Sequence, residues 1–581
     1  MRYFRAFFIN LKEKRQYFFV AALFLLLVLV NTFPVIKNIT THSIGDGGDV
    51  YQNMWNFWWM KEAVTNFQNP YFTPYVHYPF GSYLWLHTLS PVESFFSIFL
   101  QYLFNGNLVL SYNIIVIISL TLTGVFTYAL AYYLTKHRFA SFMAGYIVVF
   151  SSYMMGHTYG HLNLITVQWI PLFILFFIKF HKEQSLKNLF FSSFFFLMII
   201  LASFNQMNLV LLFSFIYFIY YLFKIKFRAQ LGYFLSLALI FFIPVVLIWP
   251  IFYNSFVAFF SKNYWNWDHG MMLFFSPELL TYFIPSQVSF YAKIFSESLI
   301  SSPLINRVHN EDMGTLSIEN ANYIGYSILF LIIYAIFKIR KDKSVRFWLI
   351  SGALFFVLSL GGVLKFYGYN TGIILPYYFI YKFIPLIYVP GRFNLIVIFC
   401  IGIICAFAIK NICGGLKRGK YVAVCFLIFI VVLIEMQAIP YPNSQYSLPA
   451  IYSKMKNDSD SYAILDCSYP NNYGKAMYAQ TIHGKKILNG YVSRIEVKLS
   501  QFIDNEPIIS DIFKGCSYKI KRKYKPELNF VLNDEWYINA KTKLVDYNIK
   551  YVLISKKYSE IYLDGFDKVF EDEKIIAYQI F

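Results

Sequence analysis

The sequence predicts a mainly α-helical fold: a polytopic bundle of transmembrane helices followed by a small α/β domain. Of its 581 residues, 58% are hydrophobic and only 14% are charged, whereas soluble domains carry about 25% charged residues. Apolar runs of about 20 residues recur up to residue 439, and ~20 residues cross the hydrocarbon core of a bilayer. From Pro440 onward, charges of both signs mix with short β-like runs at 462–466, 550–555 and 575–580.

The basic residues of the chain mark its topology. The formal charge is +19, and the lysines and arginines gather in short loops between apolar runs, which is typical of topology signals. We therefore expect no nucleic-acid partner. The leader 1–16 is basic and the run Tyr17 to Ile36 has no small-residue cleavage site. It is predicted to be an uncleaved span whose leader stays in the cytoplasm.

The stretch 82–104 either spans the membrane or lies in its interface. It is apolar but contains His87, Pro91 and Glu93, and its far flank has no basic residue. If it crossed, most later basic loops would face outward. If it lies in the interface, these loops are all cytoplasmic: 136–138, 179–187, 224–228, 338–346 and 410–420. The positive-inside rule therefore favours the interface.

On this basis we predict a multi-pass protein of the cytoplasmic (inner) membrane with its N-terminus inside and its C-terminal domain outside. About eleven spans follow, at 17–36, 108–134, 139–156, 163–180, 188–203, 208–223, 231–250, 322–338, 346–364, 392–410 and 421–439. They form a membrane domain, 1–439, with outer loops at 37–107, 251–321 and 365–391. The tail, 440–581, is predicted to be an extracytoplasmic α/β domain. In the first loop, Trp55, Trp58 and Trp59 suit the headgroup layer.

Asp46 and Asp49 lie in a Gly-rich segment just after the first span. Carboxylates at the end of a span are costly to desolvate, which suggests chemistry, an ion or a structural partner. Outside the membrane they could take a proton from an acceptor hydroxyl or bind a divalent cation. Alternatively, Asp46 is a turn residue bonded to nearby backbone N–H groups.

His157 and His161 also fall on the predicted outer side, four residues apart. That spacing places them on one helical face, as in some metal sites. No third ligand is identifiable from the sequence, which favours hydrogen-bonding histidines over a metal site. Arg392 begins the tenth span, where it could grip a phosphate or extend toward the interface. The remaining candidates for substrate binding are Glu278, His483 and Arg494.

The cysteines show no metal-ligand spacing, and a disulfide between Cys467 and Cys516 is one possibility among others. No nucleophile elbow, P-loop or dinucleotide fingerprint is present, so nucleotide-driven chemistry has no support.

Four short strings together carry a resemblance. The acidic segment 45–49 is followed by Trp55 and Trp58, then come 156–163, 390–393 and the tail stretch 480–494. The pattern resembles the GT-C superfamily of integral-membrane glycosyltransferases, and within it a bacterial branch labelled YfhO-like. The resemblance implies a sugar donor on a polyprenyl phosphate and a first-loop aspartate that acts as base or metal ligand. The Asp-Gly-Gly-Asp spacing departs from the common Asp-x-Asp pairs, so which aspartate acts stays open.

The sequence thus predicts an inverting glycosyltransferase with a glycan, lipid or protein of the cell envelope as acceptor. Its cofactor is not defined by the residues, although a divalent cation at Asp46 and Asp49 is one option. Two alternatives are a transporter or flippase of a lipid-linked glycan, and a non-catalytic envelope-assembly protein. Spans without mid-membrane charges argue against transport.

Overall fold

The computed structural model describes residues 2–45, 48–224, 231–261, 263–264, 269–285, 289, 318–383, 387–517, 531–559 and 561–581. The chain forms two compact units. The helical unit consists of Met1–Ile39, Asn113–Ile248 and Trp267–Asn443. The α/β unit consists of Thr40–Tyr112, Trp249–Asn266 and Ser444–Phe581.

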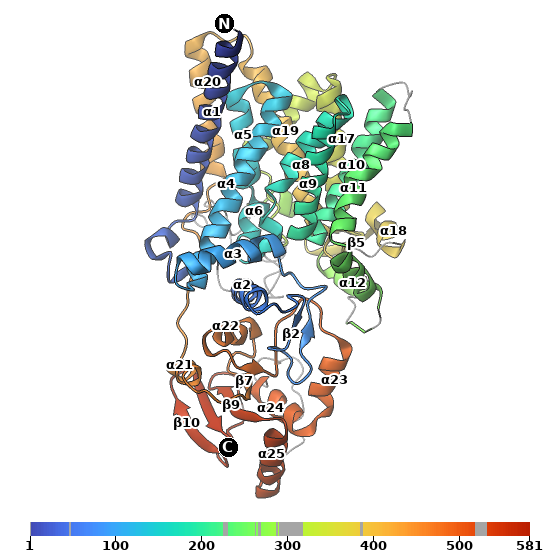
Figure 1. Ribbon diagram of the computed structural model, residues 1–581. Coiled ribbons are helices and arrows are strands. Elements are labelled where there is room, and N and C mark those ends of the chain that lie inside the picture. The colour runs from blue at the N-terminus through green and yellow to red at the C-terminus, as the bar shows by residue number, and fades with distance from the viewer. Residues whose placement is uncertain are drawn as a thin grey trace. The chain divides into compact units, whose positions relative to one another are not determined.

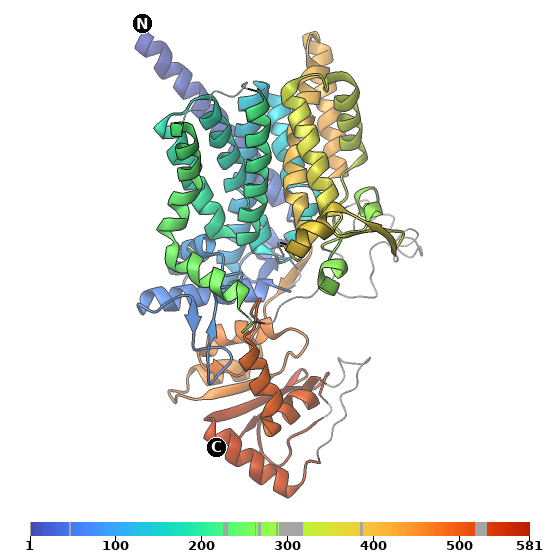
Figure 2. The same ribbon diagram turned by 90° about the vertical axis from the view of Figure 1, so that its right-hand side faces the viewer.

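The helices of the helical unit lie side by side and roughly parallel (Figures 1 and 2). Each predicted span coincides with one helix or one helix pair. These elements are α1 (Arg2–Asn31), α4 (Leu108–Thr135), α5 (Arg138–Val149) with α6 (Ser152–His157), α7 (Leu162–Ile165) with α8 (Trp169–Lys182), α9 (Leu186–Ala202), α10 (Phe204–Lys224), α11 (Leu231–Leu247), α16 (Tyr326–Tyr334) with η5 (Ala335–Ile339), α17 (Lys343–Ser359), α19 (Asn394–Cys413) and α20 (Arg418–Glu435).

The protein is a multi-pass membrane protein with a mainly helical fold. In the part of the chain that the structure describes, 5 helices are long and apolar enough to cross a bilayer. A further candidate is α11 taken together with α12 (Trp249–Phe260), and three shorter apolar helices include α9. The full set of about eleven crossings stays a prediction.

Glycines allow close packing of α1, α4, α5 and α19. A Cβ added at Gly124 would lie 2.5 Å from Cδ1 of Phe24, and one at Gly145 would lie 2.6 Å from the carbonyl oxygen of Gly124. A Cβ at Gly402 of α19 would lie 3.0 Å from the carbonyl oxygen of Ala144 on α5. Small residues at such contacts let helix backbones approach closely, which is how apolar helices gain packing energy in lipid.

Shorter elements join the spans of this unit. They are η1 (Val35–Asn38), α13 (His269–Phe274), η2 (Leu279–Tyr282), the hairpin β4 (Val363–Phe366) and β5 (Tyr369–Ile374), α18 (Pro376–Phe383) and η6 (Pro390–Phe393).

The tail contributes a five-stranded sheet in the order β10-β11-β9-β7-β8. Its strands are β7 (Ala463–Cys467), β8 (Lys486–Ile487), β9 (Ile549–Ser555), β10 (Asp567–Glu571) and β11 (Ile575–Gln579). β7 runs parallel to both β8 and β9, whereas β11 is antiparallel to β9 and β10. All residues of β7 are buried, as expected for a central parallel strand covered on both faces. The helices are α21 (Ala450–Lys456), α22 (Tyr473–His483), α23 (Val497–Asn505), α24 (Pro507–Ser517) and α25 (Asp534–Asp546).

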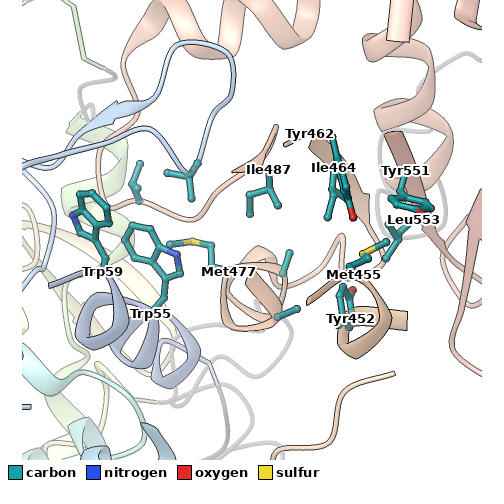
Figure 3. Close-up of a cluster of buried hydrophobic side chains, with 14 of the residues drawn as sticks. Trp55, Trp59, Tyr452, Met455, Tyr462, Ile464, Met477, Ile487, Tyr551 and Leu553 are labelled. Atoms are coloured by element: carbon teal, nitrogen blue, oxygen red, sulfur yellow. The ribbon is translucent and has the colours of Figure 1, made fainter. Parts of the chain in front are cut away.

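The first loop belongs to the same unit as the tail. It forms β1 (His42–Ile44), α2 (Val50–Thr65), β2 (Phe72–Thr73), β3 (Ser82–Tyr83) and α3 (Pro91–Leu103), and β1 pairs with β6 (Asn443–Gln445). Trp55 and Trp59 are fully buried in one core cluster with Met477, Ile464 and Leu553 (Figure 3).

The headgroup assignment of Trp55 and Trp59 is therefore wrong. The indole N–H of Trp55 donates to Oε1 of Gln480 at 2.7 Å, and that of Trp59 donates to the Pro70 carbonyl at 2.9 Å. These two bonds satisfy the polar ends of both rings without water, which lets the rings serve as core residues.

The stretch 82–104 contains a strand and a helix of 13 residues, α3. At ~1.5 Å per residue this helix covers about 20 Å, less than the ~30 Å of a bilayer core. One face of α3 exposes Phe95, Phe96 and Phe99, whereas Ser94 and Ser97 are buried. An apolar outer face on so short a helix is what interfacial placement requires. That placement stays a prediction.

Candidate functional site

A polar cluster of His157, His161, Glu319 and Arg392 lies in the helical unit, at the helix ends opposite the basic loops. α5 begins at Arg138 and α6 ends at His157, while α7 begins just after His161 and α8 ends at Lys182. Glu319 precedes α16, whose continuation ends beyond Lys338, and Arg392 precedes α19, which reaches Lys410 before it ends. The cluster is thus built at the predicted outer face.

One helical turn joins the two histidines. The N–H of His161 donates to the carbonyl of His157 at 2.9 Å, and their Nδ1 atoms are also 2.9 Å apart. Two imidazole nitrogens at this distance share one hydrogen. The Nε2 atom of His157 takes no part in this contact and is left for another partner. The i, i+4 spacing in the sequence predicts this juxtaposition.

Gly156 allows the segment that carries Glu319 to pack against α6. A Cβ at Gly156 would lie 2.6 Å from Cβ of Ala321. The Oε2 atom of Glu319 lies 3.9 Å from Nε2 of His157, and both side chains are buried. Among the residues that the structure describes, neither of these two atoms has a hydrogen-bond partner.

Arg392 lies in η6, directly after a glycine that packs against Glu319. A Cβ added at the preceding Gly391 would lie 3.4 Å from the Glu319 carbonyl oxygen and 3.6 Å from its Oε2 atom. The Nε atom of Arg392 is buried and has no hydrogen-bond partner within the described part of the chain. Leaving buried polar groups unpaired costs free energy, so this set of donors and acceptors is suited to a charged ligand.

His157, His161 and Glu319 each offer one ligand atom, and these atoms all lie within 4.8 Å of one another. Two imidazoles and one carboxylate form a donor set that suits Zn²⁺ and similar divalent ions, with a position left for substrate or water. The histidine spacing alone does not indicate Glu319 as a third ligand. The available signal is a carboxylate next to a predicted span, the same criterion that selects Asp46 and Asp49.

A hydrogen-bonded chain holds the Glu319 segment against α19. The Nδ2 atom of Asn394 donates to Oδ1 of Asn322 at 2.7 Å, and Nδ2 of Asn322 donates to the Glu319 carbonyl at 3.0 Å. The hydroxyl of Tyr282 donates to Oδ1 of Asn394 at 2.9 Å. This chain fixes the backbone from which Glu319 projects.

Of the two aspartates, Asp46 lies outside the described residues and Asp49 belongs to the α/β unit. Asp49 precedes α2, and its Oδ1 atom accepts a hydrogen bond from the hydroxyl of Tyr491 at 2.9 Å. Burial and the negative charge of Asp49 raise the pKa of Tyr491, so this phenol stays a donor at neutral pH. A tail residue therefore orients the first-loop carboxylate.

Glu278 holds a hairpin. Its two carboxylate oxygens accept the backbone N–H groups of Tyr367 and Gly368, each at 2.6 Å. Burial raises the pKa of Glu278 while these bonds lower it. Nearby, Nζ of Lys365 donates to the carbonyls of Phe274 and Ser276 at 3.2 and 3.0 Å, and burial lowers its pKa to about 8. These contacts give Glu278 a structural role at the turn between β4 and β5.

His483 and Arg494 belong to the α/β unit. The Nδ1 atom of His483 accepts the N–H of Lys485 at 3.0 Å, its ring stacks on Tyr452, and burial lowers its pKa to about 3. The guanidinium of Arg494 lies 5.7 Å from the ring centroid of Phe259. Both contacts lie within this unit and fix local structure.

The fold is similar to those of an archaeal oligosaccharyltransferase and a mycobacterial arabinofuranosyltransferase. The Archaeoglobus fulgidus oligosaccharyltransferase AglB with an inhibitory peptide and dolichol-phosphate has a TM-score of 0.50 at 12% identity, covering 95% of this chain and 72% of that one. The same enzyme with Zn and sulfate has a TM-score of 0.50 at 13% identity, with coverages of 94% and 70%. The mycobacterial arabinofuranosyltransferase AftD has a TM-score of 0.50 at 11% identity, with coverages of 98% and 40%.

By sequence, the chain belongs to the family described as a domain of unknown function, DUF6311, which matches residues 18–437. No curated protein matches the chain. At 11–13% identity the structural likenesses show the fold.

Proposed function

We propose that this protein is an inverting integral-membrane glycosyltransferase that moves a sugar from a polyprenyl-phosphate donor to an extracytoplasmic acceptor in the cell envelope. The observation that carries the proposal is the cluster of His157, His161, Glu319 and Arg392 in a GT-C-type bundle. It combines ligands for a divalent cation with a guanidinium at the membrane edge, which are the groups that a lipid phosphate needs.

In the proposed reaction, the acceptor hydroxyl oxygen attacks the anomeric carbon of the donor sugar. The bond from that carbon to the phosphate oxygen breaks, and polyprenyl phosphate leaves with the bonding electrons. Asp46 or Asp49 takes the hydroxyl proton as the general base. Arg392 holds the departing phosphate through charge-assisted hydrogen bonds, which strengthen as negative charge develops there.

A divalent cation held by His157, His161 and Glu319 would supply further positive charge for the phosphate. The unpaired Nε2 atom of His157 and Oε2 atom of Glu319 support such a ligand. The AglB structures with dolichol-phosphate and with Zn and sulfate support the same two ligand classes for a protein of this fold.

The tail domain is proposed to shape the acceptor site, because Tyr491 orients Asp49. The placement of this domain on the outer side of the cytoplasmic membrane rests on the basic loops. Membership of the YfhO-like branch rests on the four sequence strings alone.

The test is cation binding by the full-length protein in detergent, measured by titration calorimetry with Mn²⁺ and Zn²⁺. Loss of a hydrogen-bonded partner of a ligand weakens metal affinity 10–100-fold, so loss of a direct ligand in Glu319→Gln should cost ~100-fold or more. Glu278→Gln is the matched control, since it removes a buried carboxylate of the same unit that is outside the cluster. Polyprenyl-phosphate sugar consumption should fall in parallel with cation affinity.

Full cation affinity and full sugar consumption in both Glu319→Gln and His157→Ala would refute the assignment. Tight cation binding without any consumption of lipid-linked sugars would refute the activity and leave the metal site intact.

A further inference from the structure

A second charged cluster lies at the opposite ends of the helices, around Tyr133 in the last turn of α4. The Nζ atoms of Lys136, Lys179 and Lys182 lie 5.2, 5.1 and 4.8 Å from the centroid of the Tyr133 ring. Lys182 also donates to the Tyr133 hydroxyl at 3.3 Å. All pairs of these ammonium groups therefore lie within about one Debye length, ~10 Å at 0.1 M salt.

The lysines come from two connections of the helical unit. Lys136 lies between α4 and α5, and Lys179 and Lys182 lie in the last turn of α8. The charge of Lys179 is repelled by Lys136 and by Lys187, which lies in the first turn of α9. It is attracted by Glu183. Within the described part of the chain, no carboxylate lies within ion-pair distance of any of these lysines.

The local charge balance is strongly positive. Glu183 offsets one of the four lysines, and the C-terminal ends of α4 and α8 each contribute roughly half a negative charge. An excess of about two positive charges remains by this count. Cation–π contacts with Tyr133 lower the cost of gathering the ammonium groups but add no formal negative charge.

An apolar groove runs along α9 and includes Leu186, the first residue of that helix. It has a volume of about 300 Å³ and is lined by side chains of α9 and α11, among them Leu186, Phe190 and Pro244. Leu186 is the first residue of α9 and follows Lys182 closely in the chain. Leu186 and Phe190 are 85% and 61% exposed, so this surface is open to hydrocarbon chains.

We propose that Lys136, Lys179 and Lys182 bind the phosphate headgroup of an anionic phospholipid, whose acyl chains lie along the α9–α11 groove. Basic pockets between transmembrane helices recognise such headgroups, and each Lys near an anionic surface contributes about 1 kcal/mol. The excess positive charge requires an anion, and the adjoining apolar groove favours a lipid over free phosphate. The site lies at the helix ends opposite the His157 cluster and is independent of the proposed reaction.

The experiment is native mass spectrometry of the full-length protein titrated with phosphatidylglycerol, with cardiolipin and with phosphatidylcholine. The variant carries K136Q, K179Q and K182Q. Its matched control carries K338Q, K341Q and K343Q, which removes the same charge from another basic loop. Retention of the anionic lipids should fall roughly 100-fold in the variant, from the per-lysine contribution, and stay at the wild-type level in the control. A third variant with arginine at positions 136, 179 and 182 should keep binding, which separates loss of charge from loss of folding.

Equal retention of anionic lipids in the variant and the control would overturn the proposal. So would equal binding of phosphatidylcholine and phosphatidylglycerol by the wild type. Binding of inorganic phosphate that is lost in the variant, with no retention of either anionic lipid by the wild type, would show a phosphate site only and would also overturn the proposal.

Discussion

Acid should loosen the α/β unit, because its core contains neutral histidines. His77 and His483 are each only 4% exposed, and burial lowers the pKa of His77 to about 4 and that of His483 to about 3. In the unfolded chain both would titrate near pH 6.5. The unfolded state therefore binds more protons between these pH values, and stability must fall as the pH falls from about 6.5 toward 3 to 4.

The magnitude follows from the linkage relation. Between pH 7 and pH 5 an unfolded histidine becomes almost fully protonated, which costs the folded state about 2 kcal/mol for each histidine that stays neutral. The two buried histidines together remove roughly 4 kcal/mol, a large share of the 5–15 kcal/mol of a typical domain. Burial raises the pKa of Asp466, so at the acid end of this pH range the folded state binds that proton more readily than the unfolded state. This effect on stability is opposite in sign to that of the histidines.

His87 identifies one contact between the first loop and the tail that acid should break. Its Nδ1 atom accepts the N–H of Ser493 at 3.1 Å, and its Nε2 atom lies 2.9 Å from Oδ1 of Asn56. Burial, with the charge of His77, lowers the pKa of His87 to about 3. A proton on Nδ1 would abolish the bond to Ser493, so this contact between the first loop and the tail should be lost once His87 is protonated.

Hydrogen exchange with mass spectrometry measures the loss of stability in peptides covering β7 and β9. Exchange is compared at pH 5 and pH 7 after correction for the intrinsic rates. A variant with His77→Gln and His483→Gln should lose most of the pH dependence. His42→Gln, a half-buried histidine of the same unit, is the control and should keep it. A wild-type pH dependence in the double variant would refute the reasoning.

Two substitutions test the packing. Gln480→Leu should destabilise the α/β unit by ~3 kcal/mol or more, because the amide is fully buried and bonds to Trp55 and to the carbonyls of Tyr75 and Lys485, and each buried partner left unpaired costs about 1–3 kcal/mol. Chemical denaturation followed by tryptophan fluorescence measures it, and an unchanged midpoint would contradict the hydrogen-bond assignment. Gly325→Ala should lower the melting temperature of the helical unit, since Gly325 has φ +98° and a Cβ there would lie 2.6 Å from Cε of Met436. Gly232→Ala, with nothing within 4 Å, is the control and should be neutral or stabilising, so equal melting temperatures for the two variants would contradict this prediction.

The sequence predicts the helical bundle well because its signal is local. Apolar runs with lysines and arginines at their predicted inner ends mark the spans, and the helix boundaries differ from the predicted ones by a few residues, except that α1 begins at Arg2, well before the first predicted span. Strands β7, β9 and β11 are also recognisable, since each is a short, mainly apolar run, and β9 and β11 are rich in β-branched and aromatic residues. β10 is missed because its five residues are largely exposed and two are acidic and one basic, which gives no β signal.

Long-range contacts are what the sequence does not show. The burial of Trp55 depends on Gln480, 425 positions later, and no periodicity within α2 indicates such a partner. Likewise, the spacing of His157 and His161 predicts their contact, but Glu319 reaches them only through the packing of Ala321 on Gly156. The contacts of Glu278, His483 and Arg494 could not be predicted either, because an outer-loop location says nothing about a neighbouring turn or ring, and their part in substrate binding stays a prediction.

The α/β unit is assembled from three separate segments of the chain, and this has a topological consequence. One continuous core cannot have its parts on opposite sides of a bilayer. The chain must therefore cross the membrane an even number of times between Tyr112 and Trp249, and again between Asn266 and Ser444. The predicted spans satisfy both conditions, and a single crossing by 82–104 would break the unit. If the number of spans in either interval differs from the prediction, it must therefore differ by an even number.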